Sequence, residues 1–198
     1  MSPDERRALT DLSWPLAGER VLLRPPDASD PEGDLEATWR YWRDPAVTHW
    51  LPAAPADLEA HRARFLDPTR VPHTLIVELD GEVVGEAMLR VEDSWAQAEV
   101  AADARATHAE IGWVLAAEVH GRGLGTEVAS LLLRIAFDAL GMHRVSAVCF
   151  AGNTASWRLM EKLAMRREAH AQDDALHRTL GWCDSFTYAL TRSEWRAG

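Results

Sequence analysis

The chain has 198 residues, of which 47% are hydrophobic and 26% charged, so it is long enough for one globular domain with a substantial core. Its formal net charge of -10 lacks the basic excess of nucleic-acid-binding proteins, and no apolar stretch is long enough to predict a membrane span. The amino terminus is charged where a signal peptide needs an apolar core. We therefore expect no nucleic-acid partner, no membrane association and a cytoplasmic protein. One domain over 1–198 is expected, with a core over 19–195 after an N-terminal extension over 1–18.

The first half of the chain predicts one strand and two helices before a hairpin. The strand covers 19–25 and is closed by two prolines. Helices follow over 34–44 and 56–67, and Asp57 has the side chain of a helix cap. The segment 73–91 contains two apolar runs joined at Asp80-Gly81, which is typical of a tight β-hairpin.

The second half alternates strands and helices. Residues 94–108 have no clean period and are expected to form a loop, and 109–115 is an apolar run of strand length. A helix follows, because Val128, Leu131, Leu132, Ile135 and Ala139 recur at helical spacing before Gly141.

The chain is expected to close with a strand, a helix and two more strands. The strand covers 143–150, and Asn153 is a good cap for the helix after it. The last two strands are expected at 165–170 and 182–191. A hairpin that precedes a strand-helix-strand crossover predicts an α/β fold with a mixed sheet.

Two cysteines, Cys149 and Cys183, have no second ligand at metal-binding spacing. Neither a disulfide framework nor a metal site is predicted, and both residues are expected to be buried thiols. Cys149 also has no identifiable histidine partner, so a core thiol is favoured over a nucleophile.

Three glycines, Gly121, Gly123 and Gly125, lie between the strand at 109–115 and the following helix. Amides without side chains at the positive end of a helix form an anion site, which predicts binding of a phosphate. The alternative is a tight turn that needs glycine only for its conformation.

Two other phosphate-binding motifs are excluded by spacing. Both the dinucleotide fingerprint and the nucleotide-triphosphate loop require a glycine where this chain has Thr126. The sequence also contains neither a nucleophile elbow nor a His-Glu-x-x-His zinc motif.

The segments "HGRGLGTEV" and "NTASWRLMEKLAMRRE", in this order and at this interval, resemble the GNAT acetyltransferase superfamily. The opening "ERVLLRP" and the ending "WCDSFTYALTRSEW" resemble its ribosomal-protein N-acetyltransferase (RimJ/RimL-like) branch. The resemblance covers 19–195. It implies a single GNAT-like α/β domain whose mixed, mostly antiparallel central sheet is flanked by helices.

The resemblance also implies how acetyl-CoA is bound. The backbone of Trp113, Val114 and Leu115 would pair with the pantetheine arm, and Asn153 would bond this arm while Ser156 lies near the sulfur. The diphosphate would be bound by amides of the loop, whose residues are His120, Gly121, Arg122, Gly123, Gly125 and Thr126.

Two positions depart from the family pattern. His120 stands where Gln or Arg is usual, which leaves the amides unaffected. Ala164 stands where the second helix usually ends in Gly, and a left-handed conformation there would cost about 1 kcal/mol.

The implied reaction is direct attack of a neutral amine on the thioester, without a covalent enzyme intermediate. Glu110 interrupts an apolar strand and is the candidate base, against an exposed position or an ion pair with an arginine. His108 and a water are alternative bases, although a loop histidine without function is favoured for His108. Ser156 is the candidate acid by resemblance, against a plain first-turn helix residue, and Tyr188 is a weaker candidate.

Three tryptophans, Trp39, Trp42 and Trp50, lie in the first helical region, which borders the acceptor cleft in this family. They would form an aromatic wall over the acceptor or pack in the core.

The acceptor is expected to be a primary amine, and its identity is not encoded in the motifs. The branch implies a protein or peptide N-terminus, whereas small amines such as polyamines and aminoglycosides would suit the acidic charge. Whether longer acyl groups are used stays open. A non-catalytic acyl-CoA-binding module is the alternative function, and similar proteins are commonly homodimers.

Overall fold

The computed structural model describes residues 8–197, which group into two compact units. The first unit consists of Ser13–Leu89 and Trp113–Leu131. The second unit contains Arg90–Gly112, the described residues up to Leu12 and those from Leu132.

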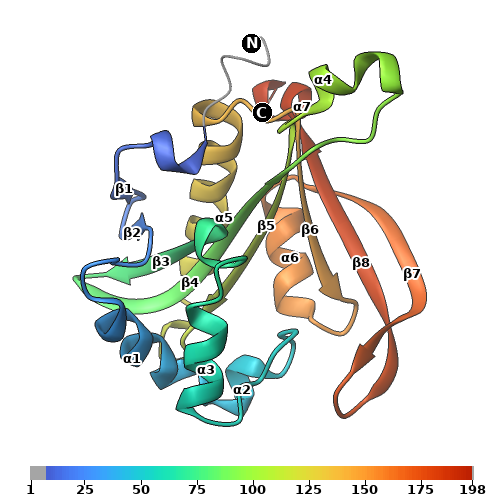
Figure 1. The fold of residues 1–198 in the computed structure, drawn as a ribbon. Coiled ribbons are helices and arrows are strands. Elements are labelled where there is room, and N and C mark those ends of the chain that lie inside the picture. The colour runs from blue at the N-terminus through green and yellow to red at the C-terminus, as the bar shows by residue number, and fades with distance from the viewer. Residues whose placement is uncertain (1–7, 198) are drawn as a thin grey trace. The chain divides into compact units, whose positions relative to one another are not determined.

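Strands and helices are interspersed along the chain (Figure 1). The strands are β1 (Leu16–Ala17), β2 (Val21–Arg24), β3 (Thr74–Leu79), β4 (Glu82–Glu92), β5 (His108–Leu115), β6 (Arg144–Phe150), β7 (Arg166–His177) and β8 (Gly181–Thr191). The α-helices are α1 (Pro31–Trp42), α2 (Pro45–Thr48), α3 (Leu58–Phe65), α4 (Ala101–Ala104), α5 (Leu124–Arg134), α6 (Thr154–Lys162) and α7 (Arg192–Ala197). Short 3-10 turns are η2 (Leu9–Asp11), η3 (Val71–His73), η4 (Ala98–Val100) and η5 (Ala117–Val119), and a π-helical turn, η6 (Ile135–Ala139), continues α5.

The strands form a sheet in the order β1-β2-β3-β4-β5-β6-β8-β7. The pairs β1–β2, β2–β3, β3–β4, β6–β8 and β7–β8 are antiparallel. The pair β5–β6 is parallel, as a strand-helix-strand crossover requires. The expected α/β fold with a mixed, mostly antiparallel sheet is therefore confirmed.

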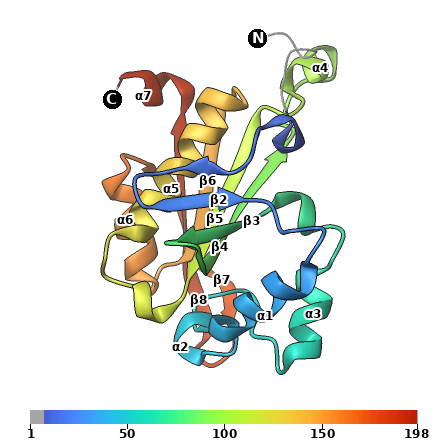
Figure 2. The ribbon, with the colours of Figure 1, turned by 90° about the vertical axis from the view of Figure 1, so that its left-hand side faces the viewer.

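In the first unit, helices α1 and α3 pack against β3 through a buried cluster of Leu35, Phe65 and Ile76. Figures 1 and 2 both show these two helices side by side. Asp57 caps α3 as expected, because its carboxylate accepts from the amide of Ala60 at 2.8 Å.

In the second unit, α6 and α7 each pack against another element through a tryptophan side chain. Trp157 of α6 meets Phe186 of β8 edge to face at 6.4 Å, and Trp195 of α7 stacks on Phe137 at 5.5 Å. Arg192 donates to the carbonyl of Gly141 at 2.7 Å, so the start of α7 caps the end of the π-helical turn.

Several elements differ from the expectation. Strand β7 extends to His177 instead of ending near residue 170, because its mostly exposed side chains carry no apolar alternation while its backbone pairs with β8. Two bulges interrupt that pairing, and Asp173 has a φ of 48° there. The segment predicted as a loop over 94–108 contains η4 and α4, and the helices α2 and α7 were not predicted. Short helices such as these depend on tertiary packing more than on periodicity.

Candidate functional site

The glycine loop lies in the first unit, between η5 and α5. Gly121 and Gly123 have φ values of 72° and 80°, a conformation that side-chain-bearing residues rarely adopt. Gly125 has no such requirement, since it lies inside the first turn of α5. The conformation of the loop thus explains two of the three glycines.

Backbone amides are the donors that this loop offers. The amide of Glu127 bonds to the carbonyl of Gly123 at 3.2 Å, and the amides before it have no partner within the helix. Gly121, Arg122 and Gly123 are exposed, so their amides can meet a ligand in solution. His120 directs its Nε2 to the carbonyl of Leu115 at 2.9 Å, which ties the loop to the end of β5. The loop therefore fits an anion such as a diphosphate.

The end of β5 is held closely against β4 within the first unit. A Cβ at Gly85 would lie 2.4 Å from the carbonyl oxygen of Val114, and the amide of Ala116 bonds to the carbonyl of Val84 at 2.9 Å. Gly85 is therefore a packing residue that positions the end of β5, and the sequence analysis missed it, although a glycine inside a strand is a signal of close backbone approach.

In the second unit, β5 and β6 pair over a short distance. The register joins His108–Glu110 to Arg144–Ser146 and ends there. Beyond this point, Ala147–Phe150 of β6 pairs with β8. In the part of the chain that the structure describes, β6 has no β5 partner from Ala147 on, so this stretch presents an open backbone edge to a ligand.

Glu110 lies at the end of this short parallel pairing and forms an ion pair with Arg90 of β4. Its side chain is 26% exposed. Arg90 also pairs with Glu92. The arginine pair considered in the sequence analysis is therefore present, and Glu110 is a partly exposed, ion-paired carboxylate.

His108 opens β5 instead of lying in a loop. Its Nε2 lies 2.8 Å from the hydroxyl of Ser146 and its Nδ1 lies 3.6 Å from the Glu92 carboxylate. Burial lowers the pKa of His108, and Arg144 adds to the effect while Glu92 opposes it. A lowered pKa keeps the imidazole neutral at pH 7, the form that can accept a proton.

Asn153 and Ser156 meet at the start of α6. Asn153 is the N-cap, and its side-chain oxygen accepts from the amide of Ser156 at 3.3 Å. Burial raises the pKa of Cys149 to about 11, although a hydrogen bond with Ser156 acts in the opposite direction. Cys149 is thus an unreactive thiol at neutral pH. The expectation of two buried thiols is wrong in degree, because Cys149 and Cys183 are both half-buried free cysteines.

Tyr188 is buried, and its hydroxyl is committed to other side chains. The hydroxyl donates to Glu161 at 2.8 Å and accepts from Nε of Arg167 at 2.8 Å. Burial raises the pKa of Tyr188. These contacts favour a structural role for Tyr188 and agree with its being a weaker candidate than Ser156 for the general acid.

A buried polar cluster in the first unit contains one of the three tryptophans. Trp42 donates its indole N–H to Glu86 of β4, and the guanidinium of Arg64 lies 3.7 Å from the centre of the Trp42 ring. Burial raises the pKa of Glu86, against the effects of Arg64 and Trp42. Trp42 is therefore a core residue, whereas Trp39 and Trp50 are half-buried.

Glu86 is a candidate functional residue that the sequence analysis missed. Its signal in the sequence is a single acidic residue within the apolar run "VVGEAML". A buried carboxylate of this kind is costly unless it is paired.

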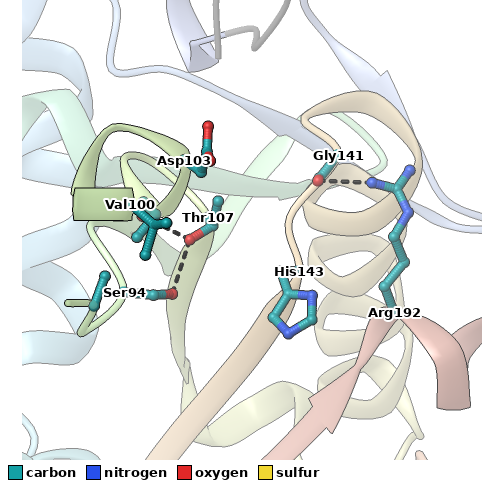
Figure 3. A pocket seen from close by; sticks show the side chains of 9 residues that line it. Ser94, Val100, Asp103, Thr107, Gly141, His143 and Arg192 are labelled. Atoms are coloured by element: carbon teal, nitrogen blue, oxygen red, sulfur yellow. Dashed lines mark hydrogen bonds between the residues drawn. The ribbon is translucent and has the colours of Figure 1, made fainter. Parts of the chain in front are cut away.

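A pocket of about 420 Å³ lies in the second unit, between the segment 94–107, the turn after η6 and the start of α7 (Figure 3). Thr107 bonds to Ser94 at 2.8 Å and Arg192 to Gly141 on its walls. None of the predicted site residues lines this pocket.

No group of three or more His, Cys, Asp or Glu side chains within residues 8–197 is placed to hold a metal ion. No helix in the same range has the length and apolarity to cross a membrane.

Comparison with known proteins connects this geometry to a family. The family model described as "Acetyltransferase (GNAT) domain" matches residues 20–166. The uncharacterized N-acetyltransferase YnaD of Bacillus subtilis (strain 168) is 34% identical over 86 residues, which are 43% of this chain and 50% of YnaD. The putative ribosomal N-acetyltransferase YdaF of the same strain is 31% identical over 91 residues, 44% of this chain and 47% of YdaF. The chain thus spans about half the length of these two relatives.

Solved structures agree with this match. An acetyltransferase of the GNAT family from Bacillus anthracis has a TM-score of 0.74 and 27% identity, over 91% of this chain and 100% of that one. Mycobacterium smegmatis RimJ in complex with CoA-disulfide has a TM-score of 0.69 and 22% identity, over 88% of this chain and 83% of that one, and shows a shared fold. The chain belongs to the GNAT acetyltransferase family, and its relatives include the ribosomal-protein N-acetyltransferase branch.

Proposed function

We propose that this protein transfers the acetyl group of acetyl-CoA to a primary amine. The observation that carries the proposal is the loop before α5, where Gly121 and Gly123 adopt left-handed conformations and leave amides exposed at a helix N-terminus. Acetyl-CoA supplies the activated acetyl group, and every other role falls to groups of the chain.

The cofactor roles are divided among backbone groups and the side chain of Asn153. Amides of the loop from His120 to Thr126 bind the diphosphate. The backbone of Trp113–Leu115 pairs with the pantetheine arm as an added strand would. Asn153 keeps its amide N–H groups for the same arm, because its oxygen already caps α6.

Glu110 removes the proton of the attacking amine, directly or through a water. Its partial exposure supports this role, because a substrate amine or a water can approach the carboxylate from solvent. As the nitrogen–carbon bond forms and the carbon–sulfur bond breaks, this proton passes to Glu110. His108, which Ser146 and Glu92 hold in place, is the alternative acceptor.

Ser156 donates a proton to the departing sulfur. Its position in the first turn of α6 and its hydrogen bond with the Cys149 thiol support this role, because they show that the hydroxyl can bond to a sulfur. Replacing Ser156 by alanine is expected to lower turnover without changing CoA affinity, and unchanged turnover would remove this assignment.

A protein or peptide N-terminus is the acceptor that the relative named a putative ribosomal N-acetyltransferase suggests. Polyamines and aminoglycosides are the alternative acceptors, and the net charge of -10 favours cations of this kind. One domain, a homodimer and a cytoplasmic location stay predictions of the sequence.

The first experiment measures acetyl-CoA-dependent thiol release with a panel of acceptors. The panel contains peptides with free alanine or serine termini, polyamines, aminoglycosides and a control without acceptor. Release with one class of acceptor would support the enzyme and identify its substrate class. No release across the panel, together with tight CoA binding, would favour the non-catalytic acyl-CoA-binding module.

Gly123→Val tests the placement of the diphosphate. The variant is expected to weaken CoA binding at least ten-fold in calorimetry, because a side chain at a φ of 80° distorts the loop. Gly181→Val is the matched control, since Gly181 has a φ of 82° at the start of β8 and nothing lies within 4 Å of the place that a Cβ of residue 181 would occupy. Equal CoA affinity in the two variants would contradict the proposed binding of the diphosphate by this loop.

A further inference from the structure

The side chain of Arg20, just before β2, lies against the glycine loop of the first unit. Its Nη1 donates to the carbonyl of Arg122 at 3.0 Å. Its Nη2 lies 3.7 Å from the place that a Cβ of residue 123 would occupy. The guanidinium therefore borders the backbone that is proposed to bind the diphosphate.

Glu127 holds Arg20 in this place. Its carboxylate accepts from the amides of Arg20 and Val21 at 2.6 and 3.0 Å, and from Nε of Arg20 at 2.9 Å. Burial acts to raise the pKa of Glu127, but these hydrogen bonds outweigh it and lower the pKa. Glu127 is therefore ionised at neutral pH, in the first turn of α5.

An ionised carboxylate beside an anion site opposes the binding of a diphosphate. Arg20 offsets this charge through its ion pair with Glu127. An arginine that only neutralised Glu127 would use one side of its guanidinium. Arg20 uses Nε for Glu127 and also Nη1 for the carbonyl of Arg122. Within residues 8–197 no hydrogen bond uses its Nη2, and the side chain is 47% exposed.

We propose that Arg20 is a further cofactor-binding residue, whose Nη2 donates to a phosphate oxygen of CoA beside Gly123. The proposal rests on the proposed function, since it concerns the same loop. A guanidinium suits this role because its fixed fork can bind a carboxylate, a carbonyl and a phosphate oxygen at the same time. The loop motif does not include this residue, which precedes Arg122 by 102 positions.

The test compares Arg20→Gln with the wild-type protein by calorimetry, using CoA, 3′-dephospho-CoA and pantetheine as probes. Arg40→Gln is the matched control, because Arg40 is an exposed arginine that donates to the carbonyl of Val83 at 3.1 Å and lies near Glu82. Arg20→Lys keeps the charge but cannot span all three partners. Thermal unfolding of each variant is measured alongside.

Arg20→Gln is expected to weaken CoA binding roughly ten- to hundred-fold, because a hydrogen bond between charged groups is lost. Pantetheine, which has no phosphate, should bind both proteins equally. Added salt should weaken CoA binding to the wild type more than to the variant. If Arg20→Gln also binds 3′-dephospho-CoA more weakly than the wild type does, the contact lies at the diphosphate. If the two proteins bind 3′-dephospho-CoA equally, the contact lies at the 3′-phosphate.

Two results would overturn the proposal. One is CoA affinity in Arg20→Gln equal to that in Arg40→Gln. The other is an equal loss for CoA and pantetheine, which would give Arg20 a structural role in the loop. A wild-type protein that binds no CoA would instead contradict the proposed function itself.

Discussion

At the scale of single residues, the ion pair of Glu110 with Arg90 decides how this carboxylate can act. Arg90 contacts one of the two carboxylate oxygens that could accept a proton from the substrate. His108 differs, because burial keeps it neutral and its two ring nitrogens have partners in Ser146 and Glu92. The second unit thus holds two candidate proton acceptors on β5, and they have different neighbours.

Glu110→Gln tests the first of them. If Glu110 is the base, kcat should fall roughly 100-fold or more while CoA affinity stays unchanged, because general-base catalysis contributes effects of this size. Glu99→Gln, at an exposed acidic position in η4, is the control. A fall of less than a few-fold would transfer the role to His108, and His108→Gln would then be measured in the same assay.

At the scale of elements, the end of α6 has a backbone conformation that the residue type at this position disfavours. Helix α6 begins with an N-cap from Asn153 and ends at Lys162, and Ala164, two residues later, has a φ of 58°. The amide of Met165 bonds to the carbonyl of Met160 at 3.0 Å, which closes the last turn. The left-handed conformation foreseen for Ala164 is therefore present, in a residue that carries a Cβ.

Ala164→Gly is expected to raise the free energy of unfolding by about 1 kcal/mol, since glycine adopts positive φ without a steric cost. Urea unfolding measures the change. Ala102→Gly, in α4, is the control and should lower stability by roughly 0.5–1 kcal/mol. If both substitutions destabilise the protein equally, strain at Ala164 is not the cause.

At the scale of the whole molecule, a buried histidine makes stability depend on pH. His61 is 0% exposed, and its Nε2 lies 2.9 Å from the hydroxyl of Thr38. Burial lowers the pKa of His61 to about 4, and Arg64 adds to this effect. The unfolded chain therefore binds more protons than the native protein between the ordinary histidine pKa and about 4, so acid in this window favours unfolding.

We expect the free energy of unfolding to fall by about 2 kcal/mol through His61 as the pH is lowered from 7 to 5. Urea unfolding at the two pH values measures this, and His61→Gln should remove that part of the loss. His170→Gln is the control, because His170 is an exposed histidine that bonds to Asp184. Equal pH dependence in wild type and His61→Gln would contradict the assignment.

The order of the main elements was predictable because each carries its own local signal. The hairpin turn at Asp80-Gly81, with φ values of 53° and 82°, follows from residue types that favour such turns. The cap at Asp57 and the left-handed Gly141 follow in the same way. The part of β7 beyond residue 170 lacked such a signal, since its pairing with β8 depends on backbone groups and its side chains are mostly exposed.

The sequence by itself determined the glycine loop, the caps and turns, and the family resemblance that predicted the fold and an acetyl-CoA site. These features depend on residues that are close together in the chain, so their chemistry can be judged without knowing the rest of the molecule. Only the tertiary structure decided that Arg90 pairs with Glu110, that Gly85 lets β4 approach Val114, and that Arg20 reaches the loop. These contacts join residues that are distant in the sequence, and burial and charge at such places are properties of the folded chain alone.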